Sequence, residues 1–226
     1  MCKYRAEITK GEEIRYISHL DYAATIERAI RRAHLPAAYS EGFNPRLKMA
    51  FASALAVGVT SEAEYLDFEL TEHLPQPEVF ERLSAELPAG IKLLRLRQFA
   101  GKHKALMAEV DLARYQINVP LAGEEAAVKT AVTRFLGEKE CIYKRVTPKK
   151  TREIEVKQYI EELQGAVDGK AVRLEMAIRI TQSGSIKPGE ILELLVEKYG
   201  LPVKPEQVLI HRLALWGQGK PLIELV

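Results

Sequence analysis

The segment Val172–Ile180, with the sequence VRLEMAIRI, places an apolar side chain at every second position. Successive side chains of a β-strand point to opposite faces of the sheet, so this alternation predicts a strand with one buried face. Strands of this kind are typical of antiparallel sheets, which have one covered face and one face open to water. We therefore expect an antiparallel sheet, and weaker alternations elsewhere in the chain predict its other strands.

The remaining strands and the helices follow from the same kind of periodicity. Alternating segments occur at residues 4–8, 66–70, 91–96 and 115–119. Helices are predicted where apolar residues recur every three or four positions between end signals. The predicted helices run from about His19 to His34, from Pro77 to Leu87, from Val128 to Leu136 before Gly137, and from Pro188 to Gly200. Proline in the first turn and glycine after the last match the usual asymmetry of helix ends.

The order of these elements is strand, helix, strand, strand, helix, strand through residue 99, and it repeats through residue 216. This order predicts an α+β fold made of two tandem ferredoxin-like βαββαβ units with antiparallel sheets. We expect the first unit over residues 1–100 and the second over residues 105–226, with an insertion near residues 146–168. The segment Gly101–Lys104 is the natural junction between them.

Composition limits the class of protein. The 226 residues are 47% hydrophobic and 28% charged with a net charge of +2, which is ordinary for a globular protein and does not by itself indicate nucleic-acid binding. Cys2 and Cys141 lack metal-ligand spacing and suit a reducing compartment. No apolar stretch is long enough to span a membrane, and the N-terminus lacks the apolar region of a signal peptide. We therefore expect a cytoplasmic protein without a metal, a cofactor or a membrane contact.

The most unusual segment is residues 39–48, YSEGFNPRLK, which combines aromatic side chains, turn residues and cations. Glycine and Asn-Pro mark a loop. Aromatic rings beside cations can stack nucleobases and hold phosphates, although a structured connection with Phe43 in the core would explain the same residues. The candidate nucleic-acid-binding residues of this loop are Tyr39, Phe43, Asn44, Arg46 and Lys48.

A second candidate surface is the stretch 144–152, KRVTPKKTR, which contains five cations and no acid. Pro148 makes a helix unfavourable, so we expect a basic arm or hairpin that binds nucleic acid through Lys149, Lys150 and Arg152, or else a solvated loop. Acidic residues gather instead between Glu62 and Glu86. This charge asymmetry is hidden by the nearly neutral total, and the acidic segment offers a possible docking face for a protein.

The start of the first predicted helix carries Ser18, His19 and Asp21. A Ser-x-x-Asp sequence at a helix start is a capping box, and His19 and Asp21 do not face each other on a helix, so a catalytic Ser-His-Asp group is not favoured. His19 stays a weak candidate for a neutral general base. Arg31 and its neighbours Arg28 and Arg32 either bind phosphate or form a solvated face in which Glu27 pairs with Arg31.

No P-loop, dinucleotide-binding glycine pattern or H-E-x-x-H motif occurs in the chain. The segment Gly184–Gly189 before the last predicted helix resembles an anion-binding helix start only weakly, because a strand-to-helix turn explains it equally well. The catalytic residues are therefore unknown, and the sequence favours a protein without an activity of its own.

Several motifs together resemble the radical-SAM-linked protein family. They are residues 15–21 (RYISHLD), 38–46 (AYSEGFNPR) and 58–65 (GVTSEAEY), followed by the looser segments 150–154 and 184–188. Leu47 and Ala50 stand where this family would have proline and serine. The resemblance implies a radical S-adenosylmethionine (radical SAM) protein as partner, because members occur beside such a protein or fused to its C-terminus. The resemblance assigns no catalytic residues, and the chain lacks a three-cysteine cluster motif, so it is not expected to bind an iron–sulfur cluster.

Three hypotheses follow for the function. In the first, the chain is an accessory RNA-binding module that presents a substrate, such as a tRNA or an rRNA, to a radical SAM enzyme. In the second, it is a protein-docking subunit that uses the acidic segment around Glu62–Glu72 and does not contact RNA. In the third, it is an enzyme that acts on RNA, with His19 as acid or base and Arg46 or Lys48 holding a phosphate.

Overall fold

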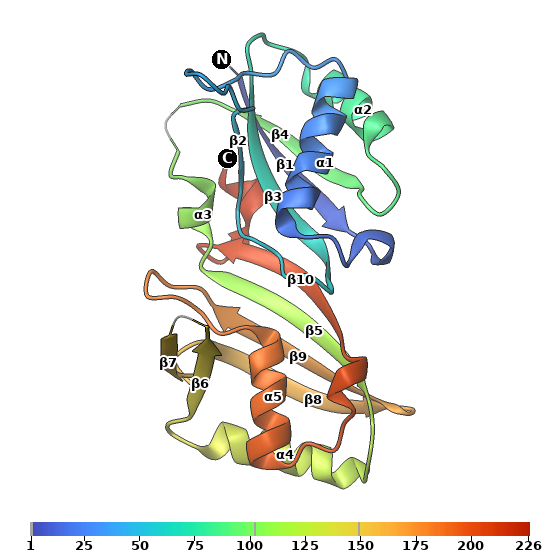
Figure 1. The fold of residues 1–226 in the computed structure, drawn as a ribbon, viewed down its shortest axis with the longest axis vertical. Coiled ribbons are helices and arrows are strands. Elements are labelled where there is room, and N and C mark those ends of the chain that lie inside the picture. Colours follow the sequence, from blue (N-terminus) through green and yellow to red (C-terminus); the bar gives the residue numbers. More distant parts are fainter. Residues whose placement is uncertain (1, 102, 149) are drawn as a thin grey trace. The chain divides into compact units, whose positions relative to one another are not determined.

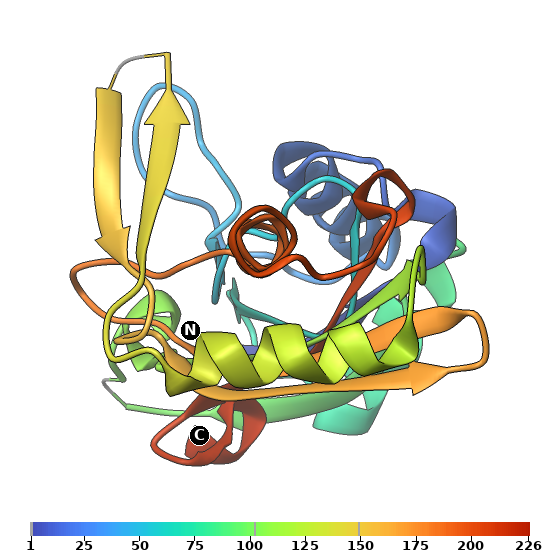
Figure 2. The ribbon, with the colours of Figure 1, turned by 90° about the horizontal axis from the view of Figure 1, so that it is seen from below.

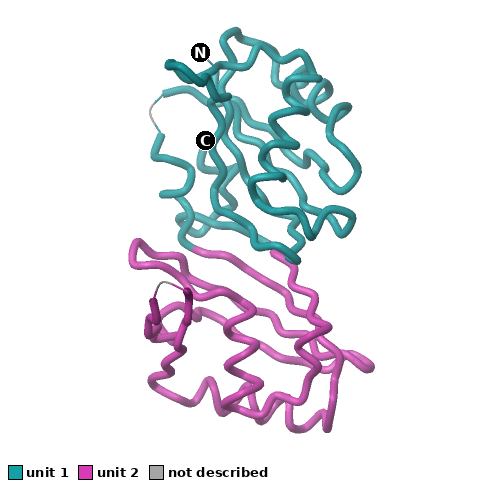
Figure 3. Tube along the Cα trace, viewed as in Figure 1, with its two compact units in different colours: residues 1–111, 214–226 teal, residues 112–213 magenta. Residues whose placement is uncertain are grey.

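The computed structural model describes residues 2–101, 103–148 and 150–226, and the chain divides into two compact units (Figure 3). Unit 1 contains residues 1–111 and 214–226, and unit 2 contains residues 112–213. The sequence predicted two consecutive units, 1–100 and 105–226, whereas here the chain leaves unit 1, forms unit 2 and then returns to unit 1 for its last segment.

Unit 1 is an antiparallel sheet with helices on one face (Figure 1). Its strands lie in the order β4-β1-β3, and β2 pairs with β3 at Leu66–Phe68. The elements are β1 (Cys2–Lys10), α1 (His19–Arg32), β2 (Met49–Phe51), β3 (Val59–Leu70), α2 (Gln76–Glu86), β4 (Leu93–Phe99) and α3 (Leu106–Glu109), followed after unit 2 by the end of β10 (Leu209–Gly217), β11 (Lys220–Pro221) and the 3-10 turn η3 (Leu222–Leu225).

The core of unit 1 lies between the sheet and the two long helices. Tyr4, Ala6 and Ile8 of β1 point to this side, and α1 meets them with Ile26 and Ile30, all fully buried. This is the helix face that the spacing predicted. The helix ends at Arg32, before the predicted His34, whose backbone has the left-handed φ of +50° that a continuing helix cannot accommodate.

Unit 2 repeats the plan of a sheet with helices on one face (Figure 1). Its strand order is β10-β5-β9-β8, and β9 pairs antiparallel with both β5 and β8. The elements are β5 (Leu112–Pro120), α4 (Glu125–Gly137), β6 (Ile142–Thr147), β7 (Lys150–Glu155), β8 (Ile160–Asp168), β9 (Ala171–Arg179), α5 (Pro188–Tyr199), the 3-10 turn η2 (Pro205–Gln207) and most of β10.

The predicted α+β fold with mostly antiparallel sheets is confirmed. The strand first identified from its alternation is β9, in which Val172, Leu174 and Met176 are buried as expected. The insertion differs from its predicted range of 146–168. It is a separate two-stranded sheet of β6 and β7, seen as the yellow pair in Figure 2, while residues 160–168 form β8 of the main sheet of unit 2.

No helix in the described ranges 2–101, 103–148 and 150–226 has both the length and the apolar character needed to cross a bilayer.

Candidate nucleic-acid interface

The loop 39–48 is closed at its base by backbone pairing. Tyr39 and Leu47 form an antiparallel bridge, and the Ser40 N–H donates to the Arg46 carbonyl at 2.8 Å. The Arg46 N–H donates in turn to the Ser40 hydroxyl oxygen at 3.0 Å. These bonds hold the two ends of the loop together, so the residues between them form a projecting tip.

Phe43 occupies that tip. Its side chain is fully exposed, at 104% of the reference area, and Asn44 and Arg46 are exposed beside it. Gly42 precedes it with a φ of +117°, a conformation that side chains with a Cβ rarely adopt, so the shape of the tip depends on glycine. The alternative that Phe43 packs in the core is therefore wrong.

Tyr39 and Lys48 lie at the base of the loop and are held by neighbours in unit 1. The Arg31 guanidinium of α1 lies 5.7 Å from the centre of the Tyr39 ring, which is 39% exposed. The Lys48 ammonium is 3.9 Å from a carboxylate oxygen of Glu69 on β3. The loop thus presents one exposed ring at its tip and a second ring with cations at its base.

Two of the three arginines of α1 already form ion pairs, which argues against the phosphate-binding alternative. The Arg31 guanidinium pairs with Glu27 at 2.5 Å, as the solvated-face alternative predicted, and Arg32 pairs with Glu86 of α2 at 2.9 Å. Arg28 is exposed on the same helix. We therefore interpret this face mainly as a solvated helix surface.

Ser18 is the N-cap of α1, as predicted. The Asp21 N–H donates to the Ser18 hydroxyl oxygen at 3.2 Å, and that hydroxyl donates to the Asp21 carboxylate at 2.7 Å. Asp21 is thereby turned toward Ser18, and His19 instead packs edge-on against Phe51 of β2, with ring centres 5.0 Å apart. The Ser-His-Asp arrangement of a hydrolase is not formed.

His19 and Lys48 lie on opposite faces of the unit 1 sheet. Phe51 packs with the core on the helix side, whereas Lys48 pairs with Glu69, whose partner across the ladder is Lys3 on the outer side. The structure therefore does not bring His19 together with Lys48, which is one of the two cations that the third hypothesis offered beside Arg46.

The hairpin of β6 and β7 is fastened to α5 by one of its faces. Arg145 makes two hydrogen bonds to the Glu190 carboxylate, both at 2.6 Å, and Tyr143 donates to Glu193 at 2.7 Å. The hydrogen bonds that Arg145 donates to Glu190 raise the pKa of the Arg145 guanidinium. Glu190 also accepts the Lys187 N–H at 2.8 Å, so this helix start is capped by its own side chain and the turn interpretation of residues 184–189 is favoured.

The other cations of the basic stretch are distributed over both faces of the hairpin. Lys144 pairs with Glu153 at 3.6 Å on the outer face, and one Arg152 nitrogen donates to the Ser183 carbonyl at 3.1 Å. Lys150 is exposed near the tip, and Lys149 lies outside the described residues. The predicted basic arm is a hairpin, and part of its positive charge is neutralised by nearby acids.

The acidic segment does not form one continuous acidic face. Along β3, Glu64 is buried with 1% exposure, and Asp67 and Glu69 pair with cations of neighbouring strands. Glu62 and Glu72 are exposed. Successive side chains of a strand lie on opposite faces of the sheet, so acids that are close in sequence do not share one surface here.

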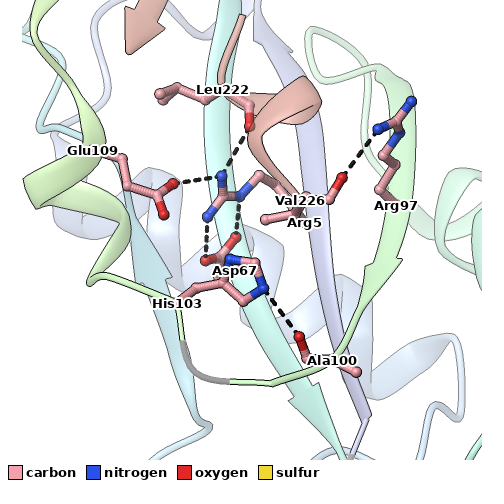
Figure 4. A network of polar contacts seen from close by, with 8 residues as sticks. All are labelled: Arg5, Asp67, Arg97, Ala100, His103, Glu109, Leu222 and Val226. Atoms are coloured by element: carbon pink, nitrogen blue, oxygen red, sulfur yellow. Dashed lines mark hydrogen bonds and ion pairs between the residues drawn. The ribbon is translucent and has the colours of Figure 1, made fainter. Parts of the chain in front are cut away.

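The sequence pattern does not predict the buried network around Arg5 (Figure 4). The Arg5 guanidinium has no exposed surface and holds both Asp67 oxygens at 2.8 and 3.0 Å, Glu109 at 2.7 Å and the Leu222 carbonyl at 2.8 Å. Burial lowers the pKa of Arg5, but the hydrogen bonds to Asp67 and Glu109 more than offset this effect. The only sequence signal was a charge inside an alternating strand, which ordinarily indicates the solvent face.

The comparisons with known proteins concern the family and the fold. A family model described as "Uncharacterized protein conserved in bacteria (DUF2344)" matches residues 3–188. No curated protein matches the chain. Among solved structures, "Crystal Structure of a Cbf5-Nop10-Gar1 Complex" aligns with a TM-score of 0.50 and 9% identity, over 94% of this chain and 50% of that chain. At this identity the likeness concerns the fold alone.

Two further solved structures align with lower scores. "Structure of H/ACA RNP bound to a substrate RNA containing 2'-deoxyuridine" has a TM-score of 0.49 and 11% identity, over 94% of this chain and 49% of that chain. An unknown protein from Galdieria sulphuraria has a TM-score of 0.27 and 11% identity, over 96% and 98%. The chain thus spans about half the length of the first two proteins.

Proposed function

We propose that this chain, which belongs to the DUF2344 family of conserved bacterial proteins, is an accessory module that binds RNA and presents it to a partner enzyme. The observation that carries the proposal is the complete exposure of Phe43 on a loop with a closed base. An exposed aromatic ring gains nothing for folding, whereas a ring beside Arg46 provides a platform on which a base can stack near a phosphate-binding cation.

The fold supports this proposal in a general way. We propose that each unit is ferredoxin-like, and the strand orders β4-β1-β3-β2 and β10-β5-β9-β8 support a tandem arrangement of two such units. The solved structure with a TM-score of 0.50 is a Cbf5-Nop10-Gar1 complex. Fold does not determine function, so the weight of the proposal rests on the loop and the hairpin.

The partner enzyme is proposed to be a radical SAM protein. This part rests on the motifs of residues 15–21, 38–46 and 58–65, which resemble the radical-SAM-linked family. An accessory role is consistent with the placement of His19, which packs against Phe51 on the helix side of the sheet and away from Lys48. The partner can be tested by co-purifying the tagged chain from cells and asking whether a radical SAM protein is recovered in a fixed ratio.

RNA binding is tested by crosslinking the protein to total cellular RNA, with Phe43→Ala beside wild type. We expect the apparent affinity for recovered RNA to fall between about fivefold and a hundredfold, because loss of one stacking platform costs about 1–3 kcal/mol per base. Leu20→Ala is the matched control, since Leu20 is an apolar residue of unit 1 with 79% exposure and lies on a different element.

The contribution of positive charge to RNA affinity is measured separately in the same experiment, from the dependence of affinity on salt. Arg46→Gln should reduce the slope of log affinity against log salt by about 0.7, the value for one phosphate contact on a single strand. Equal recovery of RNA by wild type, Phe43→Ala and Leu20→Ala would contradict the loop assignment. No RNA with any of the proteins would leave a protein-docking role as the better proposal.

A further inference from the structure

The outer face of the unit 1 sheet, away from α1 and α2, carries ordered rows of side chains. The ladder places Lys3 between Glu69 on one side and Phe99 on the other, and the Lys48 carbonyl accepts the Glu69 N–H at 3.1 Å. Lys48, Glu69, Lys3 and Phe99 therefore form one row across four strand segments. Because side chains alternate, this row is on the face opposite the buried Tyr4 and Phe68.

This row forms the floor of a groove. The segment 103–107, which leads into α3, borders the row and leaves a groove of about 610 Å³. That volume is within the range of about 300–1,000 Å³ that is typical of ligand sites. The side chains that bear on its chemistry are Lys3, Lys48, Glu69, Phe99, Lys104 and Met107.

The apolar part of the groove is formed by Phe99 and Met107. The Phe99 ring forms a T-shaped pair with His103, with ring centres 5.0 Å apart, and the Arg5 guanidinium lies 5.6 Å from its centre. Met107 is 67% exposed although it is a large apolar side chain. A ring and a thioether at one groove form a surface suited to the face of a planar heterocycle.

The charged part of the groove favours an anion. Glu69 is shared by two ammonium groups at long distances, 3.6 Å from Lys3 and 3.9 Å from Lys48. Asp67, the other carboxylate of the groove, is held by two hydrogen bonds from Arg5. Lys104 adds an exposed cation at the edge. A phosphate in the groove therefore meets three lysines. Of the two carboxylates that line the groove, Glu69 opposes its binding, because the charge of Asp67 is already compensated by Arg5.

We infer that this groove binds one nucleotide of single-stranded RNA, with its phosphate near Lys3 and Lys48 and its base against Phe99 and Met107. The inference rests on the proposed function and extends it. Lys48 ends the loop 39–48 and also lines the groove, so the loop and the groove share this lysine. The groove then selects RNA that is unpaired at this nucleotide, because a paired base cannot present its face.

The test measures binding of fluorescein-labelled decauridylate and decaadenylate to the full chain by anisotropy. Phe99→Leu keeps an apolar side chain but removes the ring, and we expect it to weaken binding by about tenfold. Met107→Ala is a second groove variant at an exposed position, so the groove can still be tested if Phe99→Leu does not fold. Lys104→Gln should reduce the salt slope by about 0.7, whereas Lys92→Gln, an exposed lysine of unit 1 away from the groove, should leave it unchanged.

The outcomes separate the groove from the proposed function. If Phe43→Ala weakens binding but Phe99→Leu, Met107→Ala and Lys104→Gln do not, the groove inference is overturned while RNA binding by the loop stands. If wild type binds neither oligonucleotide, both fail. If polyglutamate displaces the RNA at equal concentration and shows the same dependence on Phe99, the groove is assigned to an acidic protein segment instead.

Discussion

At the scale of single residues, Arg5 and Phe43 are two examples from unit 1 in which burial runs against residue type. Arg5 is fully buried, and Phe43 is fully exposed. Each inversion has its own explanation: Arg5 is compensated by two carboxylates and a carbonyl, whereas Phe43 is compensated by nothing within the described chain. A buried charge whose hydrogen-bonding groups all have partners indicates a structural role, whereas an exposed ring without packing indicates a ligand-binding role.

Removing Arg5 should destabilise the protein strongly. Arg5→Ala leaves Asp67 and Glu109 with uncompensated charge, and Glu109 is nearly buried, so we expect the free energy of unfolding to fall by about 3–5 kcal/mol. Urea denaturation followed by circular dichroism measures this change. The exposed Arg28→Ala on α1 is the matched control and should change it by less than about 0.5 kcal/mol.

A replacement of the whole network tests the reason for that loss. In the variant Arg5→Met with Asp67→Leu and Glu109→Met, no charge stays behind, so stability should recover by at least half of the loss in Arg5→Ala. If the triple variant is no more stable than Arg5→Ala, the loss arises from packing around the arginine and not from unpaired carboxylates.

At the scale of elements, the hairpin of β6 and β7 shows how register decides which cations are available. Arg145 and Arg152 stand opposite each other on the face toward α5, an unfavourable like-charge pair that Glu190 relieves. Lys144 is on the other face with Glu153. The run of cations in the sequence is therefore divided by the pleat into an anchoring face and an open face.

Cutting the anchor should loosen the hairpin locally. Arg145→Ala removes a bidentate, partly buried pair with Glu190, so the amides of residues 142–155 should exchange faster by an amount that corresponds to about 1.5–3 kcal/mol. Hydrogen exchange followed by mass spectrometry measures this. Lys144→Ala removes only an exposed pair at 3.6 Å and should have little effect. Equal effects from both variants would show that Arg145 does not anchor the hairpin.

At the scale of the whole molecule, the division into units is set by the path of the chain and not by the order of elements alone. The chain completes β4, passes through α3, builds unit 2 and returns through the end of β10 and η3 to unit 1. Leu222 and Ile223 of the returning segment are buried, and the Leu222 carbonyl accepts from Arg5. The final segment is thus part of the architecture of unit 1.

Gly217 is the position where this return is tightest. A Cβ at Gly217 would lie 2.1 Å from the Glu109 carbonyl oxygen, which belongs to backbone and cannot move like a side chain. Gly217→Ala should therefore lower the free energy of unfolding by about 1–3 kcal/mol or more, as overpacked sites do. Gly137→Ala, where a Cβ would meet nothing within 4 Å, is the matched control in the same denaturation experiment. A stable Gly217→Ala variant would mean that α3 shifts freely.

The sequence by itself determined the periodic features of this protein. Apolar spacing predicted the buried faces of α1 and β9, Ser18 predicted the start of α1, and Gly42 with Asn44-Pro45 predicted a loop between residues 39 and 48. These features were accessible because they depend on contacts between residues that are close in sequence or on the period of one element.

Only the tertiary structure decided which charges are buried, paired or exposed. Arg5 meets Glu109 and Leu222 across 104 and 217 residues, and Lys3 and Lys48 join one groove because two strands share a ladder with β3. A linear pattern gives the face of a strand that a side chain occupies, but it does not give what covers that face. Packing between segments far apart in the sequence determines what covers it. Here the outer face of the unit 1 sheet, which the pattern assigned to solvent, contains a buried ion network with a groove beside it.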